Sequence, residues 1–306
     1  MKIIYHHVQF AADEPDRLPY LTKNNAMMKK NLFWLIFIFS FSCQFFISSC
    51  SNPANLARTE SIQKTSAAAD ELLLATSELR KEINQKIESN PNSSSEDFIA
   101  LVDQKTKEIE EVKTQIDNLA PSRSFDSNKK KNFDKIRTYQ QRLSNLSREV
   151  SAIHKSFEKE LDKKLKSDVY FDTGSSIISK TGEEELKKII ANDFNTLITE
   201  WKNEEAYGNK PMKVKIKIIG YADLQGSPNI ELRQNKNLAI SKKRAESVKN
   251  IVGLYLEELK KKHQIQIQIE FEGKGEEAPP KLTDISLINN PDRRVCYISG
   301  YVIPVF

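Results

Sequence analysis

Cysteine and histidine are scarce in this chain of 306 residues, which contains three cysteines and four histidines. Cys43 and Cys50 lie in or beside an apolar N-terminal segment, and Cys296 lies in an apolar stretch near the C-terminus. A disulfide framework within the folded part is therefore not expected, and Cys296 is expected to be a small core residue. The histidines are scattered along the sequence, so we expect no metal site and no cofactor.

The chain also lacks a strong excess of one charge, since 47 lysines and arginines stand against 42 aspartates and glutamates, a net charge of +5. Basic and acidic residues are interleaved along the stretches with a helical pattern, which is typical of a solvated helix face. We therefore expect no nucleic-acid partner. The sequence shows no Cys–His or Ser–His–Asp constellation either, so the chain is not expected to be an enzyme.

A long apolar run near the N-terminus, Leu32 to Phe41, follows two lysines. A basic start before such a run is typical of a secretory signal peptide. Residues 1–49 are accordingly expected to be a leader and signal peptide, with the true start at Met27 or Met28. The bulk of the chain is then exported.

The end of this segment, Ile-Ser-Ser-Cys at 47–50, resembles the lipobox of bacterial lipoproteins. The resemblance implies that Cys50 carries a lipid and becomes the first mature residue, anchored at the periplasmic face of the outer membrane of a Gram-negative-type bacterium. The alternative is an uncleaved transmembrane helix, because residues 32–49 just reach the ~18 residues needed to span a bilayer.

Three amphipathic helices are expected next, over residues 55–87, 93–116 and 132–165. Ser93 and Glu96 have the spacing of a capping box at the start of the second helix. Apolar residues three and four apart in the third helix favour a coiled-coil-like seam. We assign residues 50–166 to a helical region, either folded back as a bundle or partly extended, that acts as a spacer or binds another envelope protein.

The remaining residues, 167–306, combine alternating strands with amphipathic helices. Strands are expected at 169–171, 214–218, 265–271 and 293–302, and helices at 186–201 and 237–259. Because the second and third strands are apolar on one side and charged or polar on the other, both helices should cover the same face. The predicted fold class is α+β, a two-layer sandwich of the βαβαβ-β type preceded by an all-α region.

Five blocks in this part occur in the order found in one family. They are Tyr170-Phe171-Asp172-Thr173, Gly220-Tyr221-Ala222-Asp223, Asn237-x-x-Ile240-Ser241-x-x-Arg244-Ala245, Gly273-x-Gly275, and Asp292-Arg293-Arg294-Val295. Together they resemble the OmpA-like peptidoglycan-binding domain, over residues 168–304. The resemblance implies non-covalent binding of the diaminopimelate-type stem peptide of peptidoglycan.

Carried over residue by residue, Asp223 would take the ammonium of the ligand and Arg244 its carboxylate. An arginine can grip a carboxylate through two parallel N–H donors, which a lysine cannot do. Asn237 lies on the same helical face as Arg244, close to the helix N-terminus, whose N–H groups favour an anion. Supporting candidates are Asp172 and one of Arg293 and Arg294.

Structural roles remain open for these residues. Asp223 and Arg244 could form an internal ion pair, and Asn237 and Asp172 could cap turns. The chain also departs from the family pattern, since Ala222 replaces the usual Thr and the stretch from Asp223 to Asn237 is longer than usual.

The sequence thus predicts an exported lipoprotein that links the outer membrane to the cell wall. A stator-like channel subunit is the alternative with an uncleaved anchor. Such a subunit would need an acidic residue within its apolar segment, and residues 32–49 contain none.

Overall fold

The computed structural model describes residues 54–91, 93–119, 129–171, 175–280, 282 and 293–306. The chain from Asn55 to Phe306 forms one compact unit. The expected signal peptide, Cys50 and Asp172 lie outside the described residues. Within the described ranges, no helix has the length and apolar character needed to cross a bilayer.

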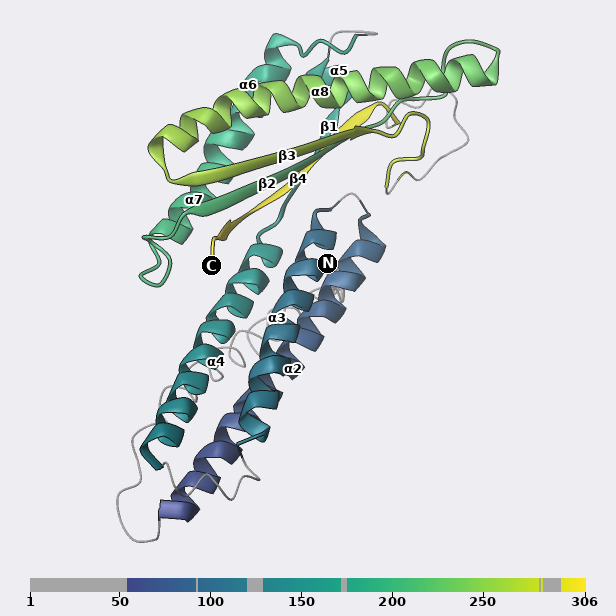
Figure 1. Ribbon diagram of the computed structural model, residues 1–306. Helices are drawn as coiled ribbons and strands as arrows, with labels where there is room; N and C mark the ends of the chain where they lie inside the picture. The colour runs from purple at the N-terminus through teal and green to yellow at the C-terminus, as the bar shows by residue number, and fades with distance from the viewer. Residues whose placement is uncertain (1–53, 92, 120–128, 172–174, 281, 283–292) are drawn as a thin grey trace, which may run out of the picture. The chain divides into compact units, whose positions relative to one another are not determined.

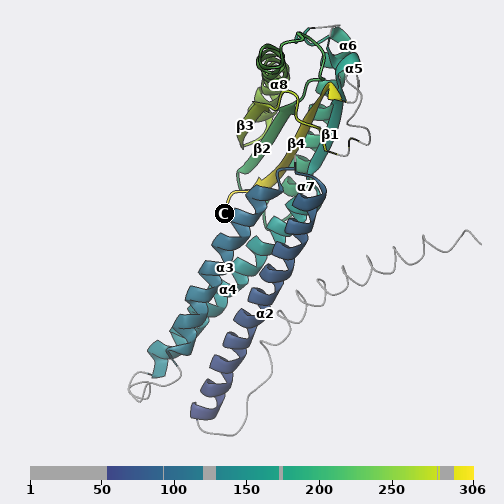
Figure 2. The same cartoon turned by 90° about the vertical axis from the view of Figure 1, so that its right-hand side faces the viewer.

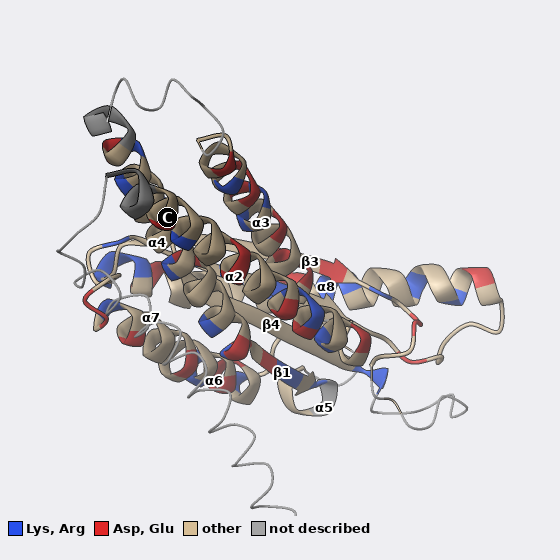
Figure 3. Cartoon of the chain, turned by 90° about the horizontal axis from the view of Figure 1, so that it is seen from below, with Lys and Arg blue, Asp and Glu red and all other residues tan. Residues whose placement is uncertain are grey.

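Three long helices open this unit and lie side by side in both views (Figures 1 and 2). They are α2 (Ala54–Ser89), α3 (Ser95–Asp117) and α4 (Lys129–Glu158). Figure 3 shows basic and acidic residues mixed along them, as the sequence predicts for solvated faces. The sequence left open whether these helices fold back or extend; they lie side by side and so fold back, and we call them the helical bundle.

Buried residues in each helix of the bundle recur at alternating intervals of three and four. The repeat is Ile62, Thr65, Ala69, Leu72, Thr76, Leu79 and Ile83 in α2, and Phe98, Val102, Lys105, Ile109, Val112 and Ile116 in α3. In α4 it includes Leu143, Leu146, Val150, Ile153 and Phe157. This is the heptad spacing of a coiled coil, so the predicted seam is confirmed and extends to all three helices.

Polar pairs between the helices agree with one register. Arg80 Nε lies 2.8 Å from Asp103 Oδ1, and Lys113 Nζ lies 2.7 Å from Asp70 Oδ1. Both pairs fit an antiparallel α2–α3 hairpin. Buried Lys105 lies 2.7 Å from Glu149 Oε2 of α4 and replaces an apolar heptad residue. A polar residue at one such position helps to fix the register of a coiled coil.

The chain leaves the bundle earlier than the sequence predicts. Helix α4 ends at Glu158, and Leu161–Lys166 forms strand β1 instead of a last helical turn. The expected strand at 169–171 is also wrong, because the short helix α5 (Ser167–Tyr170) occupies most of it and only Phe171 makes a β-bridge, to Ile178. Leu161 and Leu165 are four apart, which puts them on one face of a helix and equally of a strand, so periodicity could not distinguish the two.

The sheet has four strands in the order β1-β4-β2-β3. Strand β2 (Met212–Gly220) pairs parallel with β3 (Ile265–Gly273) and antiparallel with β4 (Val295–Pro304), and β1 pairs antiparallel with β4. The central strands are therefore β4 and β2, and β3 lies at one edge.

One face of the sheet is covered by helices (Figures 1 and 2). They are α6 (Lys180–Lys188), a π-helical turn η2 (Ile189–Phe194), α7 (Asn195–Lys202) and α8 (Ile230–Lys262). The core on this face contains the buried side chains Leu186, Ile190, Phe194, Ile198, Val214, Ile216, Ile218, Val248, Val252, Cys296 and Ile298. The predicted α+β class is confirmed, and so is a buried Cys296.

The lysines on the opposite face of the sheet suggested a face open to solvent, but part of this face is covered. Lys215 is buried, and its Nζ lies 2.6 Å from Asp97 of α3 and 3.1 Å from Glu270 of β3. The ring centroids of Phe98 and Tyr301 are 4.4 Å apart. The N-terminal end of α3 thus packs on this face and joins the helical bundle to the sheet.

Candidate ligand-binding site

The C-terminal end of β2 lies directly beneath α8, and glycines make this approach possible. A Cβ at Gly220 would lie 2.2 Å from the carbonyl oxygen of Ser241, and one at Gly273 would lie 2.4 Å from the backbone nitrogen of Lys242. Real Cβ atoms do not approach backbone so closely. The two glycine motifs found in the sequence therefore bring α8 against the ends of β2 and β3.

The loop that follows β3 completes the support. Gly275 has a φ of +56°, a left-handed conformation that glycine adopts at no steric cost. Its N–H donates to Ser241 Oγ at 3.0 Å, and its carbonyl accepts from Ala222 N at 2.7 Å. Tyr221 N also donates to the carbonyl oxygen of Val295 at 2.8 Å, so the backbone just before Asp223 is held from two sides.

Asp223 lies in the loop that follows β2 and is only 6% exposed. Its Oδ1 accepts a hydrogen bond from the backbone N–H of Gln225 at 3.2 Å. Its Oδ2 lies 3.4 Å from Arg294 Nε, within ion-pair range, yet this buried oxygen has no hydrogen bond from the part of the chain that the structure describes. A buried carboxylate oxygen with an unfilled acceptor position can receive a donor from a ligand.

Arg244 reaches the same cluster from α8 and is 5% exposed. Its Nε donates to the carbonyl oxygen of Ser175 at 3.1 Å, and its guanidinium carbon lies 5.4 Å from the centroid of the Phe171 ring. The pKa of Arg244 is lowered, chiefly by burial; Cys296 and Asp223 oppose this shift, and Arg294 adds to it. These three charged side chains therefore form one electrostatic group.

Asn237 contacts the loop that carries Asp223. Its Nδ2 donates to the carbonyl oxygens of Asp223 at 2.9 Å and of Gln225 at 3.1 Å, and to Glu276 Oε1 at 2.8 Å. The amide donors of Asn237 therefore hold the Asp223 loop. A contact of Asn237 with the ligand remains a prediction.

The two arginines just before β4 have different partners. Arg294 faces Asp223. Arg293 is 5% exposed, and its Nη1 donates to the carbonyl oxygen of Glu276 at 3.0 Å. Of the pair, Arg294 is thus the one at the candidate site.

The N-terminus of α8 does not lie where the sequence suggested. Asn229 is the N-cap, with its side chain accepting from Leu232 N, and the helix begins at Ile230. Arg244 is fourteen residues further on, about 21 Å along the helix axis. The long stretch after Asp223 adds helical turns before Asn237, so the helix N-terminus contributes no N–H groups beside Arg244.

Two residues of this region carry no signal that singled them out in the sequence. Glu276 accepts from Arg233 Nε at 2.8 Å as well as from Asn237, and these interactions lower the pKa of Glu276 against the opposing effect of burial. Its position next to Gly275 was the one available clue. Ser175 contributes only a backbone carbonyl to Arg244, which the identity of its side chain does not encode.

The arrangement suits a ligand that carries both an ammonium and a carboxylate. Asp223 offers a carboxylate oxygen, and Arg244 and Arg294 bring two guanidinium groups to the same cluster. No group of three or more potential metal ligands occurs within the described ranges.

No protein-family model and no curated protein matches the chain. Among solved structures, the periplasmic domain of Helicobacter pylori MotB is similar, with 19% identity over 47% of this chain and 83% of that one, at a TM-score of 0.31. A second structure of that domain has 18% identity over 46% and 74% of the two chains, at a TM-score of 0.29. The OmpA-like domain of FopA1 from Francisella tularensis subsp. tularensis SCHU S4 has 15% identity over 48% and 73%, at a TM-score of 0.27. At these identities and TM-scores the comparisons do not establish a shared function.

Proposed function

We propose that the C-terminal domain binds peptidoglycan without covalent chemistry, by holding the free amino-acid end of a diaminopimelate-type stem peptide. The observation that carries the proposal is the buried Asp223, whose Oδ2 lies 3.4 Å from Arg294 Nε and accepts no hydrogen bond from the described residues, while its charge acts on the buried guanidinium of Arg244. The ammonium of the ligand donates to Asp223, and its carboxylate accepts two parallel hydrogen bonds from Arg244.

The surroundings of Asp223 and Arg244 support ligand binding rather than an internal ion pair between these two residues. The ion-pair partner of Asp223 is instead Arg294, at 3.4 Å. Arg244 is held by Ser175 through Nε, which leaves its terminal nitrogens for a ligand. A preorganised donor fork loses little conformational entropy on binding, so the site is ready for a carboxylate.

The wider role is part of the same proposal. The chain is an exported lipoprotein of the outer membrane, anchored through lipid on Cys50, whose bound peptidoglycan links the membrane to the cell wall. Support comes from the N-terminal sequence pattern, and mass spectrometry of the mature N-terminus tests the acylation of Cys50 directly.

Co-sedimentation with purified sacculi tests the binding site. Asp223→Ala and Arg244→Ala should each weaken binding by about 2–5 kcal/mol, because each leaves a buried charge on the ligand or the protein without its partner. Arg244→Lys should lose most of the binding as well, since an ammonium cannot replace the two-pronged fork.

The matched controls are Arg80→Ala and Asp103→Ala, which remove an exposed ion pair of the helical bundle. These variants should bind sacculi like the parent chain. Free diaminopimelate should compete for binding, whereas lysine blocked at both its α-amino and α-carboxyl groups should compete less, because it keeps an ammonium but has no carboxylate for Arg244. Full binding by both the Asp223 and Arg244 variants would overturn the proposed site.

A further inference from the structure

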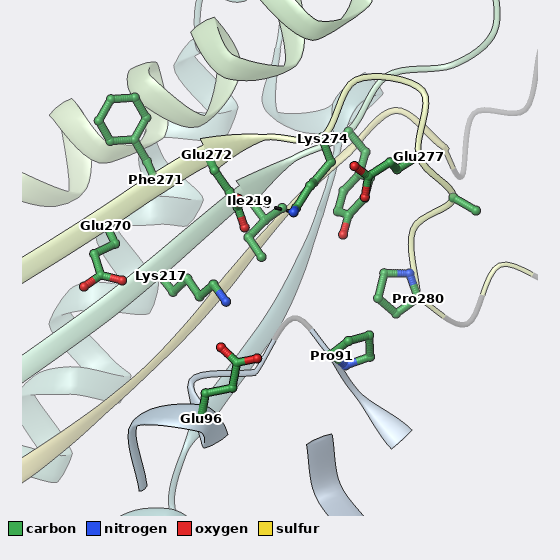
Figure 4. A pocket seen from close by; sticks show the side chains of 12 residues that line it. Pro91, Glu96, Lys217, Ile219, Glu270, Phe271, Glu272, Lys274, Glu277 and Pro280 are labelled. Atoms are coloured by element: carbon green, nitrogen blue, oxygen red, sulfur yellow. Dashed lines mark ion pairs between the residues drawn. The ribbon is translucent and has the colours of Figure 1, made fainter. Parts of the chain in front are cut away.

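A pocket of about 630 Å³ lies on the face of the sheet opposite α8 (Figure 4). Ile219 and Tyr221 at the end of β2 are buried there with Val295 and Tyr297 and provide an apolar floor. Pro91, next to the α2–α3 turn, forms part of the opposite wall. We call it the sheet-face pocket.

The wall of the sheet-face pocket near the end of β3 is held by a hydrogen bond and by an aromatic contact. Tyr297 donates from its hydroxyl to the carbonyl oxygen of Pro280 at 3.2 Å, and the rings of Tyr221 and Tyr297 meet edge to face at 6.0 Å. The pocket thus has defined walls, and its volume lies within the range of ligand sites.

Acidic groups predominate in the sheet-face pocket, which is lined by four glutamates and two lysines. Glu272 pairs with Lys274 at 3.4 Å, and Glu270 pairs with Lys215 at 3.1 Å. Glu96 and Glu277 have no ion-pair partner within the described ranges, and Figure 4 shows Glu96 pointing toward the pocket from below the sheet. The pocket therefore favours a cationic occupant.

The same pocket adjoins a free strand edge. Strand β3 is last in the sheet order and pairs only with β2 among the described strands. Met212 N donates to Gln264 O at 2.9 Å and Lys274 N donates to Gly220 O at 2.8 Å, so the even-numbered residues between them direct their backbone groups at β2. The odd-numbered residues from Ile267 to Phe271 consequently direct their N–H and C=O groups outward.

Such an edge can pair with an added strand. A second copy of this chain is a poor occupant, because pairing β3 with itself would bring acidic residues such as Glu270 and Glu272 close to their own equivalents. A strand with lysine or arginine on alternate residues instead places long cationic side chains beside Glu270 and Glu272, from where they can reach the pocket.

We propose that the outer edge of β3 and the sheet-face pocket together bind a basic, extended segment of a partner protein by strand addition. Backbone hydrogen bonds to Ile267, Ile269 and Phe271 provide affinity, and the glutamates select the basic side chains. Neither Arg244, which lies on α8, nor Asp223, in the loop after β2, lines this pocket.

Fluorescence anisotropy with the full chain and labelled synthetic peptides tests the proposal. A short peptide of alternating lysine and valine, blocked at both ends, should bind, and its affinity should fall as salt rises. The same peptide with glutamate in place of lysine should not bind. N-methylation of alternate backbone nitrogens, which removes the pairing edge but keeps the charge, should weaken binding at least roughly tenfold.

Charge-reversal variants locate the binding surface. The double variant Glu272→Lys, Glu277→Lys should lose at least roughly tenfold in affinity for the basic peptide. The control Glu257→Lys, Glu258→Lys changes the net charge equally on the exposed side of α8 and should retain binding. Asp223→Ala should bind the peptide normally, so failure here is distinguishable from failure of the peptidoglycan site.

Hydrogen exchange identifies the edge itself. Peptide binding should slow exchange of the amides of Ile267, Ile269 and Phe271. Equal binding of the N-methylated peptide, equal loss in both charge-reversal variants, protection confined to other segments, or concentration-dependent dimers formed through β3 would each overturn the proposal.

Discussion

At the scale of single residues, substitution by alanine should have opposite effects on stability at two glycines, one packed against α8 and one within it. A Cβ on Gly220 would lie 2.2 Å from a backbone oxygen of α8, whereas one on Gly253, inside α8, would meet only Ile269 Cδ1 at 3.8 Å. Gly220→Ala should lower the free energy of unfolding by about 3 kcal/mol. Gly253→Ala should raise it by about 0.5–1 kcal/mol, because alanine favours a helix interior. Urea unfolding measures both, and equal stabilities would contradict the close approach.

The buried thiol of Cys296 should make the stability of the fold fall as the pH rises into the alkaline range. Burial raises the pKa of its thiol from 9.0 to about 12, although Arg244 opposes this. The folded chain therefore keeps its proton where the unfolded chain loses it, so stability is complete below the unfolded pKa and falls as pH rises toward 12. The loss from this thiol between about pH 7.5 and 9.5 is ~0.8 kcal/mol.

Urea unfolding under reducing conditions at both pH values measures this loss. Cys296→Ala should be less stable than the parent chain at the lower pH, because it leaves space in the core. Its stability should nevertheless fall less between the two pH values. An identical fall in both chains would show that Cys296 does not cause the pH dependence.

Residue patterns predicted part of the candidate site and missed the rest for a physical reason. Asp223 and Arg244 could be named as candidates because their chemistry and their neighbours form motifs; the charge of Asp223 acts on Arg244 in the structure, and their role in binding stays a prediction. Ser175 could not be found, since it contributes a backbone carbonyl whose position depends on the fold around it. The internal hydrogen bonds of Asn237 likewise depend on the loop conformation rather than on spacing.

At the scale of elements, long periodic segments were predictable and short ones were not. The heptads of α2 and α3 repeat over several turns, so their period identified helices near the observed bounds. Strand β1 has only six residues, and its two leucines fit either structure. Pairing with β4 decides the outcome, with Leu161 opposite Gly300 and Leu165 opposite Cys296, and no local pattern reports that contact.

The start of α3 illustrates the same limit. The expected capping box did not form, since the helix begins at Ser95 and its N-cap Ser94 makes no side-chain cap. Glu160, far along the chain, accepts hydrogen bonds from the backbone N–H of Ser94 and from Ser95 Oγ instead. A carboxylate at this end of a helix is favourable wherever it comes from in the sequence.

At the scale of the whole described unit, the helical bundle and the sheet are joined by contacts that a separate spacer would lack. Ser156 Oγ of α4 donates to the carbonyl oxygen of Val302 in β4 at 2.9 Å, and Trp201 Nε1 of α7 donates to the same oxygen at 3.0 Å. The predicted boundary at residues 166 and 167 stays a prediction, but β1 precedes it and pairs with β4.

Glu160 connects these parts most directly, because it follows α4, contacts the start of α3, and lies 2.6 Å from Lys86 of α2 with its own side chain fully buried. Glu160→Ala should lower the free energy of unfolding by about 2–3 kcal/mol, since it removes hydrogen bonds to a buried charge. It should also allow the helical bundle to open before the sheet. Hydrogen exchange should then show faster exchange in α2 and α3 than in β2, whereas the parent chain exchanges both through one cooperative opening.

Glu158→Ala, at the exposed end of α4, is the control and should preserve that cooperativity. If Glu160→Ala lost stability equally in both parts, the bundle and the sheet would be coupled by the apolar contacts of Phe98 and Tyr301 rather than by this carboxylate.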